Sequence, residues 1–266
     1  MKNYIHKIIA LVCIVTSAIT PALSQSINID SLFYSDVDSV ALAKQVEIDE
    51  NTYHWIDTVE ESTYATIDKH IRGMKKRYKS IPVLANDITA SYTKEEDKIR
   101  AIFIWVSNNI AYDCKEYHNK NKTISGPVIK SNDNKYERAS KWAGIYYNYA
   151  SKVLKNRKGI CEGYSCLFYE LCKASGIKCE VVTGKVKKEK NGKFRYTSHA
   201  WNKVYMNEEW FYLDVTWAAG GCDEKVTKYY KSFSNKYYLT PAWRPFKTHI
   251  ENPKQTKRRN ELVGNW

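Results

Sequence analysis

The pattern of apolar and polar positions changes once along the chain. Up to about residue 175, apolar residues recur every three or four positions, a spacing typical of amphipathic helices. Helices are therefore predicted at 60–79, 93–110 and 139–158, and in a segment that begins at Cys161 and ends near Gly176. Beyond that glycine, apolar and polar residues alternate, which is typical of half-buried strands.

Local signals suggest where two of these helices begin or end. Pro82 is expected to stop the first helix, because proline lacks an N–H and clashes inside a helix. Thr93 and Glu96 match a capping box, in which each side chain binds a backbone N–H near the start of the helix. The polar stretch 113–135 is expected to be a surface loop.

The alternating region predicts three strands joined by tight turns. The strands are expected at 178–187, 199–206 and 210–217, with a two-residue turn at Asn207-Glu208. Helices followed by an antiparallel sheet predict an α+β fold.

The first residues match a secretory signal peptide, predicted to span 1–24. Lys2 and Lys7 flank the start of a short apolar run, and Ala22-Leu23-Ser24 matches the small-x-small cleavage pattern. We therefore expect an exported protein, secreted, periplasmic or on the cell surface. No later apolar stretch is long enough to predict a transmembrane segment.

Charge and composition suggest how the rest of the chain is organised. Residues 25–92 are predicted to form an acidic N-terminal extension and a helix, residues 93–253 the main domain, and residues 254–266 a basic tail. The formal net charge is +13, spread along the chain as on a solvated lysine-rich surface. No nucleic-acid-binding signature accompanies it, so no nucleic-acid partner is predicted; an anionic cell-wall or surface polymer is the other partner that such a charge suggests.

Six cysteines follow the signal segment, and their spacing does not resemble a compact disulfide framework. Export permits disulfides, but their pairing cannot be read from the sequence. No CxxC pair, HExxH motif or cluster of histidines predicts a metal site, and no cofactor is predicted. The six are Cys114, Cys161, Cys166, Cys172, Cys179 and Cys222.

Cys161 stands where a nucleophile would be prepared. A loop that ends in Gly159 and Ile160 delivers it to the first turn of a helix, where the positive end of the helix dipole favours a thiolate. The same position also suits an ordinary packed cysteine, because free cysteines are often buried.

His199 and Asp214 are the residues that could activate this thiol. The chemistry needs a base beside the thiol and an acceptor on the other imidazole nitrogen to fix its tautomer. With a two-residue turn at Asn207-Glu208, His199 would lie opposite Thr216, and Asp214 would be its diagonal neighbour on the same face of the sheet. Singly, each residue has a structural explanation, so the hypothesis depends on their combination.

The segments around these three residues resemble the transglutaminase-like superfamily, and most closely its branch of kyphoscoliosis-peptidase-like proteins. The resemblance spans about 93–217 and weakens toward 253, where His249 lies. It implies a papain-like core in which the cysteine helix packs on an antiparallel sheet that carries His and Asp. The matching segments are Gly159 to Tyr164, Gly176-Ile177, Ser198 to Asn202 and Trp210 to Trp217, with 98–113 upstream.

By that resemblance, Cys161 is the nucleophile of a catalytic triad, His199 the general base and then acid, and Asp214 the orienting carboxylate. The implied reaction is attack on a carboxamide or peptide bond of a protein or peptide, giving a thioester that an amine or water resolves. The backbone N–H of Cys161 is expected to be one oxyanion donor. Candidates for a side-chain donor are Trp105, Tyr112 and Trp142.

Three neighbours of the triad are given structural expectations. Asn202 and Trp217 match family positions and are expected to hold the sheet together. Glu162 is expected to point to solvent, because a carboxylate would oppose ionisation of the adjacent thiol. The chain is too short for the calcium sites and accessory β domains of animal cross-linking enzymes, so calcium dependence is not implied.

Two hypotheses follow. The first is an exported thiol enzyme of the transglutaminase-like kind, with acyl transfer and hydrolysis sharing the first half-reaction. The alternative is a non-catalytic protein-binding or scaffold module at the cell surface. The intact set of three residues favours the enzyme.

Overall fold

The computed structural model describes residues 64–119, 129–190, 192–243 and 245–262. All of them belong to one compact unit of the chain, Ile48–Trp266. The expected signal peptide at 1–24 and the acidic extension up to residue 63 lie outside the described residues. Among the described residues, no helix combines the length and apolar character needed to cross a membrane.

Two short helices, α4 Ala65–Gly73 and α5 Ile81–Thr89, open the described chain. The first predicted helix therefore ends at Gly73 instead of continuing to residue 79. Pro82 lies in the first turn of α5, so the expectation that it stops a helix is wrong. Proline is tolerated there because N–H groups in the first turn have no partner within the helix. The Ser80 hydroxyl caps α5 by accepting from the backbone N–H of Val83 at 3.5 Å.

Helix α6 Glu95–Asn109 confirms the predicted amphipathic helix but not its cap. Its N-cap is Lys94, and no side chain caps the helix, so the predicted capping box at Thr93 is wrong. The Glu96 carboxylate instead accepts a hydrogen bond from the Tyr64 hydroxyl, close to α4. The Glu96 side chain, which the capping box would have used, therefore makes a tertiary contact instead.

The polar stretch predicted as a loop contains a short helix, α7 Cys114–His118. Residues 120–128 of this stretch lie outside the described residues. Helix α8 Lys135–Asn156 follows, and a capping box of Asn134 and Glu137 starts it earlier than predicted. Strand β1 Ala111–Tyr112 pairs in parallel with β2 Lys158–Gly159, which brings the chain after α6 beside the residues that precede Cys161.

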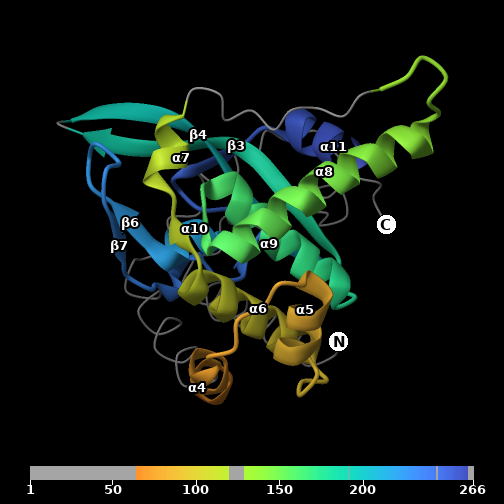
Figure 1. Ribbon diagram of the computed structural model, residues 1–266. Coiled ribbons are helices and arrows are strands. Elements are labelled where there is room, and N and C mark those ends of the chain that lie inside the picture. Colours follow the sequence, from red (N-terminus) through yellow and green to blue (C-terminus); the bar gives the residue numbers. More distant parts are fainter. Residues whose placement is uncertain (1–63, 120–128, 191, 244, 263–266) are drawn as a thin grey trace, which may run out of the picture. The chain divides into compact units, whose positions relative to one another are not determined.

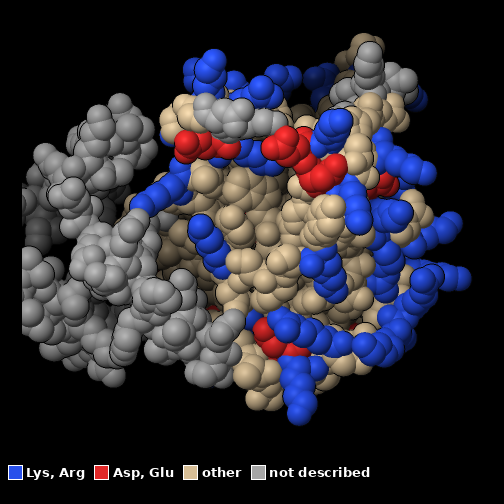
Figure 2. Space-filling view, turned by 90° about the vertical axis from the view of Figure 1, so that its left-hand side faces the viewer, with Lys and Arg blue, Asp and Glu red and all other residues tan. Residues whose placement is uncertain are grey.

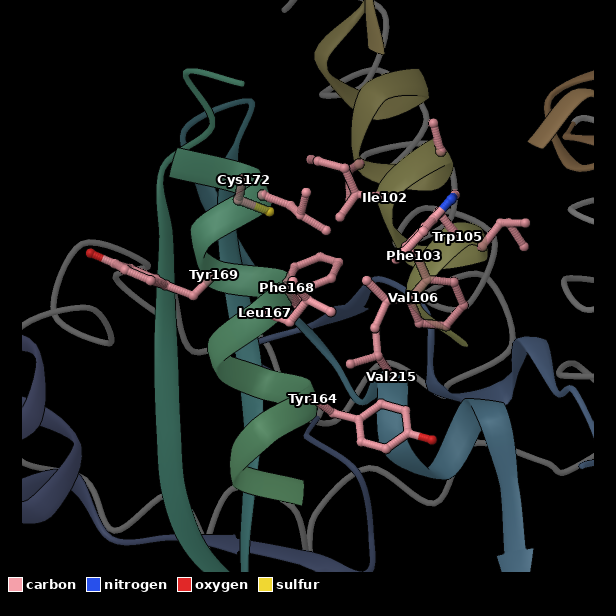
Figure 3. Packing of buried hydrophobic residues seen from close by; sticks show 14 of the residues in the cluster. Ile102, Phe103, Trp105, Val106, Tyr164, Leu167, Phe168, Tyr169, Cys172 and Val215 are labelled. Carbon is pink, nitrogen blue, oxygen red and sulfur yellow. The ribbon is translucent and has the colours of Figure 1, made fainter. Parts of the chain in front are cut away.

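Helix α9 Cys161–Ala174 is the centre of the fold and agrees with its prediction. It packs on β4 and β3 of the main sheet and is flanked by α8, α6 and α5 (Figure 1). Leu167 and Phe168 point from α9 toward Ile102 and Phe103 of α6, and all four are fully buried (Figure 3). Each such side chain contributes about 1.5–3 kcal/mol on burial, so this contact holds α9 against α6.

The main sheet confirms the predicted α+β fold. It has the order β8-β5-β4-β3-β9, and all its pairs are antiparallel. The first two predicted strands are longer than expected, because β3 and β4 remain paired as far as Lys190 and Lys193. The strands are β3 Cys179–Lys190, β4 Lys193–Met206, β5 Glu209–Leu213, β8 Thr240–Pro241 and β9 His249–Glu251.

Smaller elements complete the chain after β5. Helix α11 Pro253–Leu262 forms where a basic tail was expected, and it packs on β3 and α8. The Asn260 side chain fixes it by accepting from the Val181 backbone N–H at 3.3 Å and donating to the Val181 carbonyl at 3.2 Å. The others are α10 Val215–Ala219, β6 Gly220–Cys222, β7 Tyr229–Lys231 and the 3-10 helix η2 Asn235–Tyr237.

Basic side chains are spread over the described surface on the side of β6 and β7, and acidic ones are fewer there (Figure 2). Several basic side chains lie on aromatic rings, such as Lys187 over Phe194, with 3.6 Å between Nζ and the ring centroid. This distribution on the viewed face resembles the solvated lysine-rich surface expected from the composition.

Candidate active site

Cys161 is the first residue of α9 and is partly exposed. Two glycines let α8 approach this helix start closely. A Cβ on Gly163 would lie 2.8 Å from Cγ2 of Val153, and one on Gly159 would lie 3.1 Å from the same atom. Any larger residue at Gly163 would push α8 away, so the glycine pattern around Cys161 is required by packing.

His199 lies on β4, on the part of the strand that faces α9, and is buried. Its ring stacks on Trp201 with 5.9 Å between centroids and lies 5.7 Å from the ring of Trp217. The Cys161 thiol is near enough to be one of the groups that raise the pKa of His199. The fold thus brings together a thiol and an imidazole that are far apart in sequence.

Asp214 is fully buried directly after β5, where it caps α10. Its Oδ1 accepts from the backbone N–H groups of Thr216 at 2.8 Å and Trp217 at 3.0 Å. Its Oδ2 lies 2.7 Å from Nε2 of His199 and 3.0 Å from Nε2 of His249. An ionised carboxylate only accepts hydrogen bonds, so both Nε2 atoms carry the proton.

The predicted turn between β4 and β5 is confirmed, but the predicted strand end is wrong. Asn207 and Glu208 have φ values of 52° and 68°, and Met206 pairs with Glu209 across a two-residue turn. Strand β5 ends at Leu213 instead of residue 217, so the pairing opposite His199 does not form. The Asp214 side chain starts α10 instead, and it reaches His199 from this helix cap.

Burial and neighbouring charges act on His199 in opposite directions. Burial lowers its pKa, but the charge and hydrogen bond of Asp214 and the hydrogen bond with Cys161 outweigh this and raise the pKa from 6.5 to about 10. Burial disfavours the charge of Asp214, yet its interactions with His199 and His249 hold the pKa of this carboxyl below its ordinary value. At neutral pH the pair is therefore an imidazolium beside a carboxylate.

His249 is the site residue to which sequence reasoning gave no role. It lies on β9, at the far edge of the sheet from β5, and is buried. The sequence shows no cluster of histidines, because the residues that meet here are widely separated along the chain. The sequence signal for His249 was that it lies in the segment, up to residue 253, over which the family resemblance weakens.

The ligand atoms of His199, Asp214 and His249 lie within 4.8 Å of one another, which is the geometry of residues that could hold a metal ion. The two Nε2–Oδ2 distances of 2.7 and 3.0 Å are those of hydrogen bonds that already satisfy these groups. A bound zinc would instead need each ligand atom at about 2.0–2.2 Å from the ion and both Nε2 atoms deprotonated. The arrangement as it stands fits proton-handling chemistry.

Glu162 does not point to solvent, so this expectation is wrong. Its carboxylate pairs with Arg259 of α11, with 2.5 Å between Oε1 and Nη1. The same guanidinium donates from Nη2 to Sγ of Cys166 at 3.3 Å and lies 4.5 Å from the centre of the Tyr146 ring. A buried arginine from a segment expected as a tail thus neutralises the carboxylate next to Cys161.

Of the three aromatic residues considered as oxyanion donors, Tyr112 is the one that strand pairing places beside the residues preceding Cys161. It pairs with Gly159 across β1 and β2, and the pKa of its hydroxyl is raised by burial and then by the nearby Cys161 thiol. Trp105 is buried in the core beneath the guanidinium of Arg157, at 4.4 Å. Trp142 stacks on Tyr146 within α8.

Asn202 holds the site together as expected. Buried on β4, it donates from Nδ2 to the backbone carbonyls of Ser165 at 3.1 Å and Glu180 at 3.3 Å. These bonds join β4 to α9 and β3, and so fix the position of His199 relative to Cys161.

The six cysteines of the described chain are free thiols, as Cys161 must be for chemistry. The Sγ atoms of Cys114 and Cys222 are 3.9 Å apart. Cys166, Cys172 and Cys179 are buried in the core around α9.

The region that contains these residues is similar to known proteins. The family model described as "Transglutaminase-like superfamily" matches residues 82–215, a range that contains Cys161, His199 and Asp214 and ends before His249. The kyphoscoliosis peptidases of Mus musculus and Homo sapiens are each 26% identical over 164 residues, which cover 59% of this chain and 21% of theirs. The chain thus spans about a fifth of the length of these curated relatives.

Among solved structures, the periplasmic domain of TgpA from Pseudomonas aeruginosa is similar, with a TM-score of 0.34 and 16% sequence identity. The likeness covers 57% of this chain and 48% of that one.

Proposed function

Because the chain belongs to the transglutaminase-like superfamily, we propose that it is an exported thiol enzyme that attacks carboxamide or peptide bonds. Cys161 is the nucleophile, His199 the general base and acid, and Asp214 the orienting carboxylate. Its substrate is a protein or peptide, either free or attached to a surface polymer. Export is supported by the signal-peptide pattern of residues 1–24.

The observation that carries the proposal is the buried contact between His199 and Asp214, with the Cys161 thiol near the same imidazole. Oδ2 of Asp214 lies 2.7 Å from Nε2 of His199, so the other ring nitrogen, Nδ1, is the one left for the Cys161 thiol. An imidazole between a thiol and a buried carboxylate can take the thiol proton and keep it as an imidazolium. A histidine with a structural role alone would not need this chain of partners.

In the first half-reaction, the Cys161 thiolate attacks the carbonyl carbon, and the carbonyl electron pair moves to oxygen. Collapse of this tetrahedral intermediate reforms the carbonyl and breaks the C–N bond. His199 gives its proton to the departing nitrogen, so an amine or ammonia leaves and a thioester remains on Cys161.

In the second half-reaction, His199 takes a proton from water or from an incoming amine, whose lone pair attacks the thioester carbon. The C–S bond then breaks and the thiolate departs, with the proton retained on His199. Water gives a carboxylic acid, and an amine gives a new amide. Both outcomes use the same residues of this chain.

The developing oxyanion needs hydrogen-bond donors beside Cys161. Backbone N–H groups in the first turn of α9 have no partner within the helix, so that of Cys161 is available. Tyr112 is the side-chain donor in this proposal, because its hydroxyl stays protonated and lies close enough to interact with Cys161. Loss of one such donor costs about 100- to 1000-fold in kcat.

The test compares the purified wild-type protein with Cys161→Ala and with Cys166→Ala as a matched control. Each is incubated with casein and a labelled primary amine, and amine incorporation, ammonia release and peptide cleavage are followed. Cys161→Ala should lower the rate of whichever of these reactions the wild type catalyses by at least about a thousandfold. The rate of Cys166→Ala should stay near that of the wild type. Equal activity of wild type and Cys161→Ala would reject the enzyme and favour a binding module on this fold.

A further inference from the structure

His249 shares the carboxylate oxygen that His199 uses. Its Nε2 lies 3.0 Å from Oδ2 of Asp214, and that of His199 lies 2.7 Å from the same atom. The side chain of His249 is almost completely buried, with 1% exposed. A buried histidine aimed at the third member of a catalytic set calls for a role.

The surroundings of His249 hold its ring in one orientation. Strand β9 pairs with β3, with His249 opposite Val186. The rings of Phe246 and Trp217 lie 4.7 and 4.8 Å from the imidazole between centroids. Nδ1 lies 3.0 Å from the Thr248 hydroxyl, so Nδ1 accepts from it and Nε2 keeps the proton that faces Asp214.

The Asp214 carboxylate needs a second fixed contact. Two backbone N–H groups at the start of α10 hold Oδ1, but the torsion that places Oδ2 is intrinsically broad for aspartate. If His199 alone held Oδ2, the carboxylate would follow that ring as the ring gains and loses its proton. His249 supplies a donor that does not take part in the reaction and therefore does not move with it.

His249 is also suited to this task by its charge. Burial lowers its pKa, and the positive charge of His199 adds to this, so the net direction is downward despite the opposing effect of Asp214. The other titratable group facing it is Tyr237, with 6.3 Å between ring centroids. A neutral imidazole donates one hydrogen bond to Asp214 without placing a second cation beside His199.

The groups that shift the pKa of His249 are Asp214 and His199, whereas Cys161 acts on the pKa of His199. Both ring nitrogens of His249 have partners, Oδ2 of Asp214 at 3.0 Å and the Thr248 hydroxyl at 3.0 Å, so His249 meets the site through the carboxylate.

From these contacts we propose that His249 is a positioning residue that locks Oδ2 of Asp214 in place, so that His199 keeps its other nitrogen aimed at Cys161. The inference rests on the proposed function, because it assigns His249 to the same site. It adds a fourth residue, from an edge strand beyond the matched family region, to the three already named.

Three variants separate positioning from packing. His249→Phe keeps an aromatic ring but removes the N–H donor. His249→Gln replaces the ring with an amide that places an N–H near the position of Nε2. Phe246→Leu perturbs the ring that packs on His249 and leaves the contact with Asp214 untouched. Thermal unfolding of all three shows whether each variant is folded.

Two readouts are compared in the full protein. One is the pH dependence of Cys161 alkylation by iodoacetamide, measured by mass spectrometry, and the other is kcat in the amine-incorporation or cleavage assay. In His249→Phe, Oδ2 of Asp214 is held by His199 alone, so the carboxylate is fixed less firmly and keeps His199 charged less well. The alkylation curve should then shift to higher pH by about one unit, which is about a tenfold slower reaction on the rising part of the curve. The value of kcat should fall about 10- to 100-fold.

His249→Gln should restore most of both losses, and Phe246→Leu should leave the alkylation curve in place. An unchanged curve in folded His249→Phe, or a shift to lower pH, would overturn the inference. Loss in His249→Gln equal to that in His249→Phe would do the same. Alkylation needs no substrate, so it reports on the contact between His249 and Asp214 even if the Cys161→Ala test shows that the protein does not turn over amides. The two proposals can therefore fail separately.

Discussion

Cys161 and Cys166 lie little more than one turn apart on α9, yet the fold gives them opposite surroundings. Cys161 is partly exposed and near the imidazole of His199, whose pKa it helps to raise. Cys166 is fully buried, and burial raises its pKa far above the ordinary value even though the guanidinium of Arg259 lies 3.3 Å from its Sγ. The chemistry of a thiol on this helix is therefore decided by the elements that pack around it.

The two nearby cations differ in what they can do. The His199 imidazole can lose and regain a proton, and its partner Asp214 stabilises the protonated, cationic form at neutral pH. The Arg259 guanidinium is always charged, and its charge is already matched by Glu162 at 2.5 Å. Proximity to a cation is therefore not sufficient to activate a thiol. Cys161 lies beside a side chain that can exchange a proton, whereas Cys166 lies beside an ion pair that cannot.

The largest effect on this contrast is expected from Asp214→Asn. The asparagine can still cap α10 through its oxygen, but its NH2 group would face Nε2 of His199 and favour the wrong tautomer. Turnover should fall by about 10³- to 10⁴-fold. Steady-state kinetics measures this, with Cys166→Ala as the control that should remain near wild type. A loss of less than tenfold would mean that Asp214 does not set the tautomer of His199.

The next largest effect is the difference in alkylation between the two thiols of the native protein. Iodoacetamide should modify Cys161 directly, but it should reach Cys166 only when the core opens. An opening free energy of about 4 kcal/mol or more makes Cys166 at least about a thousandfold slower. Peptide mass spectrometry over a time course measures both rates, and both thiols should react similarly in denaturant. Comparable native rates would remove the contrast.

The smallest effect is the pH dependence of stability. The pKa of His199 is raised from 6.5 to about 10 on folding, so its contribution is fully present below pH 6.5 and is lost as the pH rises toward 10. The free energy of unfolding of wild type should therefore fall relative to His199→Gln by up to about 1 kcal/mol per pH unit across this window.

Urea unfolding at several pH values above 5, where Asp214 stays ionised, measures this difference. Below pH 8, Cys166→Ala should keep the wild-type slope, because there the Cys166 thiol stays protonated in the folded and the unfolded chain. A wild-type curve parallel to that of His199→Gln would show that His199 is not held charged by its neighbours.

Periodicity predicted the regular elements well, because burial of one face imposes the pattern directly. The apolar stripe of α9 and the two-residue turn at Asn207-Glu208 are local properties, and both are found. Each local sequence signal that was misread is compatible with two different structures. Pro82 can stop a helix or start one, and here the capping Ser80 before it makes it a start. Glu96 could cap α6, but the Tyr64 hydroxyl takes its carboxylate.

The site divides in the same way. Cys161, His199 and Asp214 could be nominated from the sequence because Cys161 starts a helix and the segments around all three resemble one family. The expected diagonal contact across two strands was wrong, since Asp214 starts a helix after Leu213 and reaches His199 from its cap. The functional pairing was thus predictable, but its geometry was not.

By itself, the sequence determined the α+β order, the helix that begins at Cys161 and the family to which the chain belongs. These depend on near neighbours along the chain, whose spacing is visible in the residues. Only the tertiary structure decided that Arg259 neutralises Glu162 and that His249 joins His199 on Asp214. Those contacts are made between strands and helices that meet only when the sheet and α9 close on a common core.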